Sequence, residues 1–203
     1  MDHHAEGLPP QAIDLPVDAP IWDRVFTVAP LVIVGTMEGE VPDLAPKHLA
    51  MPLGWDNWFC FACSPRHATQ ANAARTGQFT VSFPRPDDIV EISLAAGPRT
   101  DEGKASLAAV PTIPARVVDG VLVEHAYMWL ECEVDRIVDG FGRNSLIIGR
   151  IVAAAVAEDS LRSSESDDAD VIAGAPLLAY VPPWRFAAVG QTTAFPLHTG
   201  FSR

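Results

Sequence analysis

The apolar residues of this chain come in short runs that Gly, Pro or a charged residue soon interrupts. Leu31–Met37, Trp58–Cys63 and Phe79–Phe83 are such runs, rich in β-branched and aromatic residues. Runs of this length and composition predict β-strands, and nearly every one is too short to cross a bilayer as a helix. Strand and helix patterns do not alternate regularly along the chain, so a doubly wound parallel sheet is not expected.

The second half of the chain predicts paired strands. Asp119-Gly120 is a dipeptide that commonly closes a tight hairpin, and here it separates Ala115–Val118 from Val121–His125. Two longer strands are predicted at Tyr127–Val138 and Ser145–Ala157. Many strands beside few helices favour a mainly β fold of the α+β class, closed as a barrel.

Helical patterns are fewer and short. Arg66–Thr76 follows Ser64-Pro65 and stops before a Gly, which is typical of a helix end. Asp87–Ala96 carries acidic residues in its first turn, where the helix dipole favours them, and Glu102–Ala109 predicts a short third helix. The acidic stretch 163–170 predicts a solvated loop or a helix start.

Length and patterning predict one domain over residues 1–203, large enough to fold around its own core without metal or disulfide. The Pro-rich residues 1–20 and the final residues 190–203 are weakly patterned and predict extended arms. No basic segment followed by an apolar one opens the chain, and the odd number of cysteines suits a reducing compartment. We therefore expect the protein in the cytoplasm.

The formal net charge of −12 argues against nucleic acid or an anionic membrane as a partner, because phosphates would be repelled. A phosphorylated ligand would need a local cluster of donors. No Gly-rich dinucleotide motif, P-loop or zinc motif is present, and the histidines are dispersed, so no metal site is expected. Cys60 and Cys63 lie three residues apart in a strand pattern, which points them to opposite faces and disfavours a redox dithiol.

The segment from Asp43 to Gln78 carries the most chemical information. Ser64-Pro65-Arg66-His67-Ala68-Thr69 opens a predicted helix, whose free N–H groups, hydroxyls and arginine would suit a phosphate. The alternative is purely structural, with Ser64 as a helix N-cap and Arg66 exposed in the first turn.

Five stretches in this order resemble the flavin reductase-like, FMN-binding split-barrel family, which includes flavoredoxins. They are Asp43–His48, Ser64–Asn72, Gly77–Ser82, Leu130–Val134 and Ile148–Val152, within a span from about Ala29 to Tyr180. The resemblance implies a split β-barrel, FMN as cofactor and a homodimer. It implies that FMN is held by Ala45, Pro46, Lys47, His48, Leu49, Cys63, Ser64, Pro65, Arg66, His67, Ala68 and Thr69.

Within this assignment the first loop would lie against the isoalloxazine, and the helix start would hold the ribityl chain and the phosphate. Asn72 is expected to support that turn, and Arg99 and Lys104 to add charge near the phosphate. Three positions depart from the family pattern: Asp43 replaces Asn, His48 replaces Ser and Ala68 replaces Asp. We expect Asp43 to point away from the ring or to pair with Lys47.

Three functions remain open. The resemblance implies an oxidoreductase that transfers hydride from NAD(P)H to flavin, which needs no protein acid or base. The departures leave room for an FMN-binding flavoprotein with another electron donor or acceptor, or for a non-catalytic flavin-binding or interaction protein. Trp55 is the tryptophan that we expect beside the substrate, whereas Trp58 and Trp129 fit the core or an interface.

Overall fold

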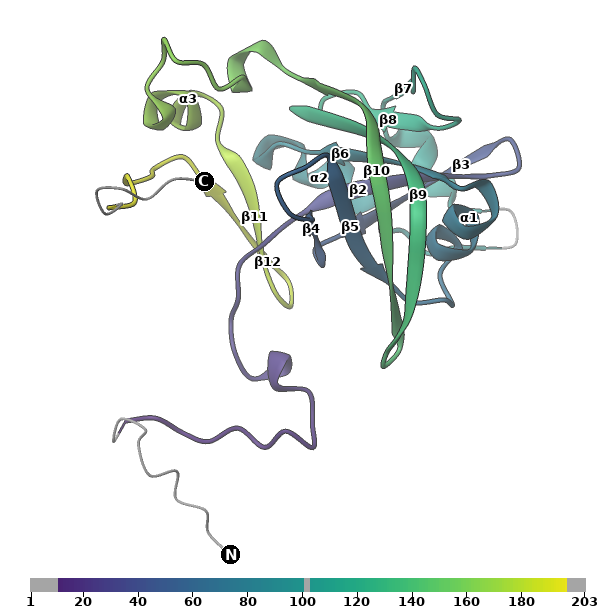
Figure 1. Ribbon diagram of the computed structural model, residues 1–203, viewed down its shortest axis with the longest axis horizontal. Coiled ribbons are helices and arrows are strands. Elements are labelled where there is room, and N and C mark those ends of the chain that lie inside the picture. Colours follow the sequence, from purple (N-terminus) through teal and green to yellow (C-terminus); the bar gives the residue numbers. More distant parts are fainter. Residues whose placement is uncertain (1–10, 101–102, 197–203) are drawn as a thin grey trace, which may run out of the picture.

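The computed structural model describes residues 11–100 and 103–196 (Figure 1). Its strands are β1 (Ala29–Pro30), β2 (Val32–Glu38), β3 (Val41–Lys47), β4 (Ala50–Pro52), β5 (Trp58–Cys63), β6 (Gln78–Phe83), β7 (Thr112–Pro114), β8 (Val121–Val123), β9 (Met128–Phe141), β10 (Asn144–Val156), β11 (Leu177–Val181) and β12 (Arg185–Val189). Its helices are α1 (Ala68–Thr76), α2 (Ile89–Leu94) and α3 (Asp168–Gly174), with 3₁₀ turns η1 (Ile21–Asp23), η2 (Pro86–Asp88), η3 (Ala105–Ala109) and η4 (Glu158–Ser160).

The main sheet has seven strands in the order β3-β2-β6-β9-β10-β5-β4, and every neighbouring pair is antiparallel. The long hairpin β9–β10 forms its middle. The strands β1, β11 and β12 form a separate three-stranded sheet beside it, and β7 pairs with β8.

The connection between β3 and β4 shows that the main sheet is curled. These strands lie at its opposite edges, yet only His48 and Leu49 separate them in the chain. Three residue steps span at most about 11 Å, so the two edges must approach each other. The sheet therefore forms a half-barrel, and the predicted split-barrel fold is confirmed.

Aromatic side chains fill the barrel. Phe59, Phe61 and Phe79 are each no more than 1% exposed, and the rings of Phe61 and Phe79 meet edge to face at 5.2 Å. Gly149 on β10 leaves room for this packing, because a Cβ there would lie 2.4 Å from the Phe79 ring. A second apolar cluster joins the outer face of β2 and β3 to α2.

A buried carboxylate explains why the predicted hairpin at Asp119-Gly120 is wrong. β8 pairs with Thr112–Pro114 rather than with Ala115–Val118. The backbone amides of Arg116, Val117 and Val118 instead donate to Glu131 Oε2 on β9, at 3.0, 2.6 and 3.1 Å. Burial alone would raise the pKa of Glu131, but the three amides and the Arg116 side chain outweigh it, and the pKa is lowered overall. The carboxylate is therefore ionised at neutral pH.

The helix predictions need smaller corrections. α1 begins at Ala68 rather than Arg66, and α2 is preceded by the 3₁₀ turn η2 instead of forming one helix from Asp87 to Ala96. The third predicted helix is the 3₁₀ turn η3, with Glu102 outside the described residues. The acidic stretch begins α3, whose first turn is capped by the side chain of Asp167.

The ends of the described chain differ from the barrel. Residues 11–20 contain no helix or strand, as expected for an arm, while 1–10 and 197–203 lie outside the described residues. Figure 1 shows residues 11–28 running away from the barrel and the β11–β12 hairpin standing beside it. The sequence patterns did not predict these two strands. Within the described residues, no helix is both long and apolar enough to cross a membrane.

Candidate functional site

The seam of the half-barrel, where β3 runs into β4, contains the first group of predicted site residues. Ala45, Pro46 and Lys47 belong to β3, and His48 and Leu49 form the link. Residues 45–47 therefore belong to an edge strand rather than to the loop that the resemblance implied. An edge strand tolerates the missing N–H of Pro46. Ala62 N donates to Leu49 O at 2.8 Å, which sets the seam beside the end of β5.

His48 lies at the centre of the seam. Its ring centroid lies 4.9 Å from that of Tyr180 on β11, with the planes tilted by 40°. Partial burial and the nearby charge of Lys47 lower the pKa of His48, so the imidazole is neutral at pH 7. Lys47 itself forms no ion pair with a described residue.

The second group of predicted site residues forms the turn between β5 and α1. His67 N donates to Ser64 O at 2.9 Å, and Arg66 N approaches Ser64 Oγ at 3.3 Å. The N-cap of α1 is His67, whose side chain makes no capping bond, so the alternative in which Ser64 caps this helix is wrong. The pKa of His67 is lowered by burial and by the charges of Lys47 and Lys104. Lys47 therefore influences both groups of site residues.

Unused donors gather at this turn. Neither Ala68 N nor Thr69 N donates to a backbone acceptor within the described residues. Thr69 is 2% exposed, and its hydroxyl makes no hydrogen bond there. Arg66 is exposed and forms no ion pair with a described residue. Amides, hydroxyls and a guanidinium match the oxygens of a phosphate ester, so this donor set fits the phosphate end of a nucleotide-like cofactor.

Asp43 is tied to cations elsewhere on the sheet edge. It is 3% exposed and lies 3.2 Å from Lys104 Nζ and 3.3 Å from Arg99. It therefore pairs with Arg99 and Lys104 rather than with Lys47, so the expected pair with Lys47 is wrong. Lys104 also donates to Leu44 O at 2.7 Å, so these two cations are already partnered.

Asn72 also differs from expectation. Its side-chain amide donates to Thr36 Oγ1 at 3.3 Å, and Arg75 donates to its carbonyl. The residue thus joins α1 to β2 and does not support the turn at Ser64.

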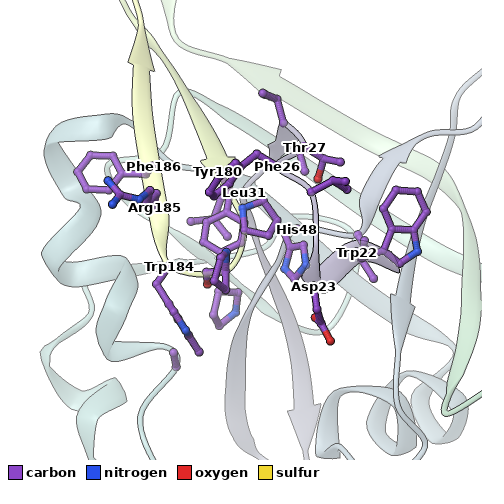
Figure 2. Close-up of a pocket in the computed structure, with 18 of the residues that line it drawn as sticks. Trp22, Asp23, Phe26, Thr27, Leu31, His48, Tyr180, Trp184, Arg185 and Phe186 are labelled. Carbon is purple, nitrogen blue, oxygen red and sulfur yellow. The ribbon is translucent and has the colours of Figure 1, made fainter. Parts of the chain in front are cut away.

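A large cavity of about 1170 Å³ opens on the seam (Figure 2). Three predicted site residues line it: Pro46, His48 and Leu49. The other walls come from residues 22–29, from α2 and from the β11–β12 hairpin. The turn at 64–69 does not line the cavity, but it is close enough to the seam for the charge of Lys47 to lower the pKa of His67.

Sequence reasoning missed most of the aromatic residues in this cavity. Trp22, Phe26, Tyr180 and Trp184 all line it, whereas Trp55 does not and is 85% exposed. The sequence gives little indication that Trp22 and Trp184 line a cavity. Trp22 follows the Pro-rich arm, and Trp184 follows Pro182-Pro183 in a segment without a strand pattern. Within the described residues, no three His, Cys, Asp or Glu side chains gather closely enough to hold a metal. The described cysteines Cys60, Cys63 and Cys132 are free.

Comparisons with known proteins agree with this architecture. The family model "Flavin reductase like domain" matches residues 25–181. No curated protein has a significantly similar sequence.

Solved structures are similar over most of the chain. Flavoredoxin from Methanosarcina acetivorans has a TM-score of 0.76 at 18% identity, covering 94% of this chain and 97% of that one. Nitrilotriacetate monooxygenase component B from Bacillus cereus has a TM-score of 0.72 at 20% identity, covering 83% of this chain and 88% of that one. An FMN-binding protein from Thermus thermophilus, with bound 1-cyclohex-2-enone, has a TM-score of 0.70 at 18% identity, covering 92% of this chain and 99% of that one. At these identities the likeness shows the fold.

Proposed function

Because this chain belongs to the flavin reductase-like family, we propose that it is an oxidoreductase that binds FMN along the barrel seam and transfers hydride from NAD(P)H to the flavin. The observation that carries the proposal is that the seam adjoins both an apolar cavity, which His48 lines, and the turn of unused donors, where the neighbouring charge of Lys47 lowers the pKa of His67. FMN has this same division, with a flat ring at one end and a phosphate at the other.

The phosphate end would be held by Ser64, Arg66 and Thr69 with the free amides at the start of α1. The ring end would lie along the seam from Ala45 to Leu49. Bound FMN supplies the hydride acceptor of the reaction. Lys47 places an unpaired positive charge at the seam, which favours a negatively charged ligand, and neutral His48 adds no charge of its own. The cavity walls shield the ring from water and receive the reaction partner.

A second candidate keeps FMN but changes the electron donor or acceptor. Two observations favour it: His48 and Ala68 depart from the family pattern at the seam and the turn, and one structural neighbour is named a flavoredoxin and another an FMN-binding protein. A non-catalytic flavin-binding protein is the third possibility. The cytoplasmic location stays a prediction.

The absorbance spectrum of the purified protein tests these proposals, recorded before and after anaerobic NADH or NADPH. A flavin band that bleaches supports the reductase and identifies the donor. A band that persists with both donors contradicts hydride transfer from NAD(P)H and favours the second candidate. A protein that retains no flavin after addition of FMN and desalting, and shows no binding in a titration, contradicts FMN binding altogether.

We also propose that the protein is a homodimer. Trp22, Phe26 and Val28 are 67%, 74% and 75% exposed on a segment that runs away from the barrel. Large apolar side chains gathered in one segment are typical of a surface that a partner covers, and arms are a common means of exchange between copies. A monomer in light scattering at micromolar concentration would contradict this.

A further inference from the structure

β12 is an edge strand of the three-stranded sheet β1-β11-β12. Its five residues, Arg-Phe-Ala-Ala-Val, include no proline and no acidic residue, and their pairing with β11 contains no bulge. Within the described residues, its backbone makes no hydrogen bond to any segment other than β11. One side of β12 therefore presents unpaired N–H and C=O groups, which are a template for another strand.

The other edges of the two larger sheets are protected against such pairing. β3 contains two prolines, and the Lys104 side chain donates to Leu44 O on this strand at 2.7 Å. β4 and β1 are three and two residues long, and each ends in a proline. Short strands, prolines and covering side chains are common means of blocking an edge. β12 is longer and has no proline or cover, which indicates that its edge is used for binding.

The pairing of β11 determines which backbone groups of β12 are free. In an antiparallel pair, residues alternate between exchanging hydrogen bonds and not exchanging them. Pro30 lies opposite Ala179 and has no N–H, so Ala179 directs its backbone groups away from β1 and towards Ala187 on β12. The neighbours of Ala187, Phe186 and Ala188, therefore direct their N–H and C=O groups to the free edge.

The N-terminal arm has the residue pattern of a strand. Apolar and polar residues alternate along it, with Ile13, Leu15 and Val17 on one face and Asp14, Pro16 and Asp18 on the other. Such alternation is typical of a strand with one buried face. Ile13 and Val17 are nevertheless 84% and 90% exposed, and residues 11–20 pair with no described strand. The arm therefore exposes an apolar face that a partner strand and its sheet would bury.

The proline of the arm selects one register against β12. Pro16 has no N–H, so it must point away from the strand that accepts the arm. Its neighbours Leu15 and Val17 then direct their backbone groups towards that strand. An antiparallel pair uses the free groups of β12 when Val17 lies opposite Phe186. Leu15 then lies opposite Ala188.

The same register brings opposite charges together. Asp18 lies opposite Arg185, which is exposed and forms no ion pair with a described residue. Opposite charges at facing positions of neighbouring strands stabilise their pairing. The arm leads away from its own barrel (Figure 1), so the β12 edge that it can join in this way belongs to a second copy.

We propose that residues 13–18 of each copy add as a fourth strand to the edge of β12 in a second copy, and that this reciprocal exchange joins the dimer. The proposal deepens the proposed homodimer, on which it rests, and does not depend on FMN or on hydride transfer. Main-chain hydrogen bonds supply the affinity, and the alternating side chains supply the register. A two-fold axis lets each copy give one arm and receive one.

Cysteine cross-linking of the full-length protein tests the register. The three native cysteines are buried, so thiols placed on the surface react first. Leu15→Cys and Ala188→Cys are made in separate chains, mixed and mildly oxidised, so a disulfide between them joins two copies. Residues opposite each other at a hydrogen-bonded position lie about 5.5 Å apart at Cα, within the range of a disulfide.

We expect the mixture to form a covalent dimer at least tenfold faster than either variant alone. Asp14→Cys mixed with Ala188→Cys is the matched control, because the side chain at position 14 faces the other side of the arm. This control should cross-link no faster than the single variants.

Proline substitutions in the arm provide a second test. Leu15→Pro removes an N–H that points to β12, and it should raise the dissociation constant of the dimer at least tenfold in sedimentation. Asp14→Pro removes an N–H that points away, and it should change that constant by less than twofold.

Equal cross-linking by the Leu15→Cys and Asp14→Cys mixtures, or equal dissociation constants for the two proline variants, would overturn the proposal. A Leu15→Cys/Ala188→Cys double variant that closes its disulfide within one chain would overturn it as well, because the arm would then fold back on its own β12. Light scattering of the unmodified protein separates two failures. A dimer that does not cross-link contradicts only the arm exchange, whereas a monomer contradicts the proposed homodimer with it.

Discussion

The barrel and the terminal segments use apolar residues in opposite ways. In the barrel, Phe59, Phe61 and Phe79 are buried against one another, and the buried carboxylate of Glu131 is satisfied by nearby amides. In the segments before β1 and around β12, Trp22, Phe26 and Trp184 lie largely in solvent. The difference indicates that the barrel is stable through its own contacts, whereas the terminal segments have surface available for ligands or partners. The barrel thus provides the stability of the fold, and the terminal segments provide surface for binding.

The largest expected difference in stability comes from replacing one phenylalanine by alanine in each of the two regions. Phe61→Ala should lower the free energy of unfolding by about 3–5 kcal/mol, because it opens a cavity in the barrel. At concentrations where the protein is monomeric, Phe26→Ala should change it by no more than about 0.5 kcal/mol, as is usual for exposed residues. Urea denaturation of both variants measures the difference. A loss for Phe26→Ala that grows with protein concentration would show that a second copy buries this ring, as the proposed homodimer implies.

Next comes the buried carboxylate. Glu131→Ala leaves three backbone amides without an acceptor and should cost about 3 kcal/mol or more. Glu133→Ala, exposed two residues along the same strand, is the control.

The pH dependence provides a second measurement on Glu131. Because the folded pKa of Glu131 is lowered, its contribution is present above the unfolded pKa and is lost as the pH falls through the folded one. Glu131→Gln should therefore reduce the loss of stability below about pH 4.5. An unchanged acid profile would show that other carboxylates dominate it.

A substitution in the turn before α1 should weaken cofactor binding. Arg66→Glu should weaken FMN binding by about 2 kcal/mol or more, because a charge-assisted phosphate contact is lost and repulsion replaces it. The free energy of unfolding without FMN should not change, since Arg66 is exposed. Arg143→Glu is the matched control. An unchanged affinity in a fluorescence titration would show that the phosphate is bound elsewhere.

The smallest effect is electrostatic. Lys47→Gln should raise the pKa of both His48 and His67, because the charge of Lys47 contributes to lowering both. Histidine NMR titrations measure these changes, with His125 as a distant reference. A rise at only one histidine would show that Lys47 does not connect the two groups of the site.

Sequence patterns predicted the barrel better than the cavity. The strands at Trp58–Cys63 and Phe79–Phe83 were recognisable because burial on both faces selects β-branched and aromatic residues throughout. The hairpin at Asp119-Gly120 was mispredicted because a distant residue, Glu131, binds the backbone amides, which no local pattern reveals. The turn from Ser64 to Thr69 was found through its residue types, although the helix begins later. The walls formed by Trp22 and Trp184 were missed because their positions depend on tertiary contacts.

The two-residue link at His48 and Leu49 has a consequence for how the chain folds. The link keeps the ends of β3 and β4 close even in an unfolded chain, but the cavity beside it also needs residues 22–29 and the β11–β12 hairpin, which are far from it in the sequence and meet it only in the folded chain. Any ligand seated in this cavity binds the native state alone and stabilises that state by mass action, by about 2.7 kcal/mol at a hundredfold excess over its Kd. The amount of intact protein in a cell would then follow the supply of that ligand.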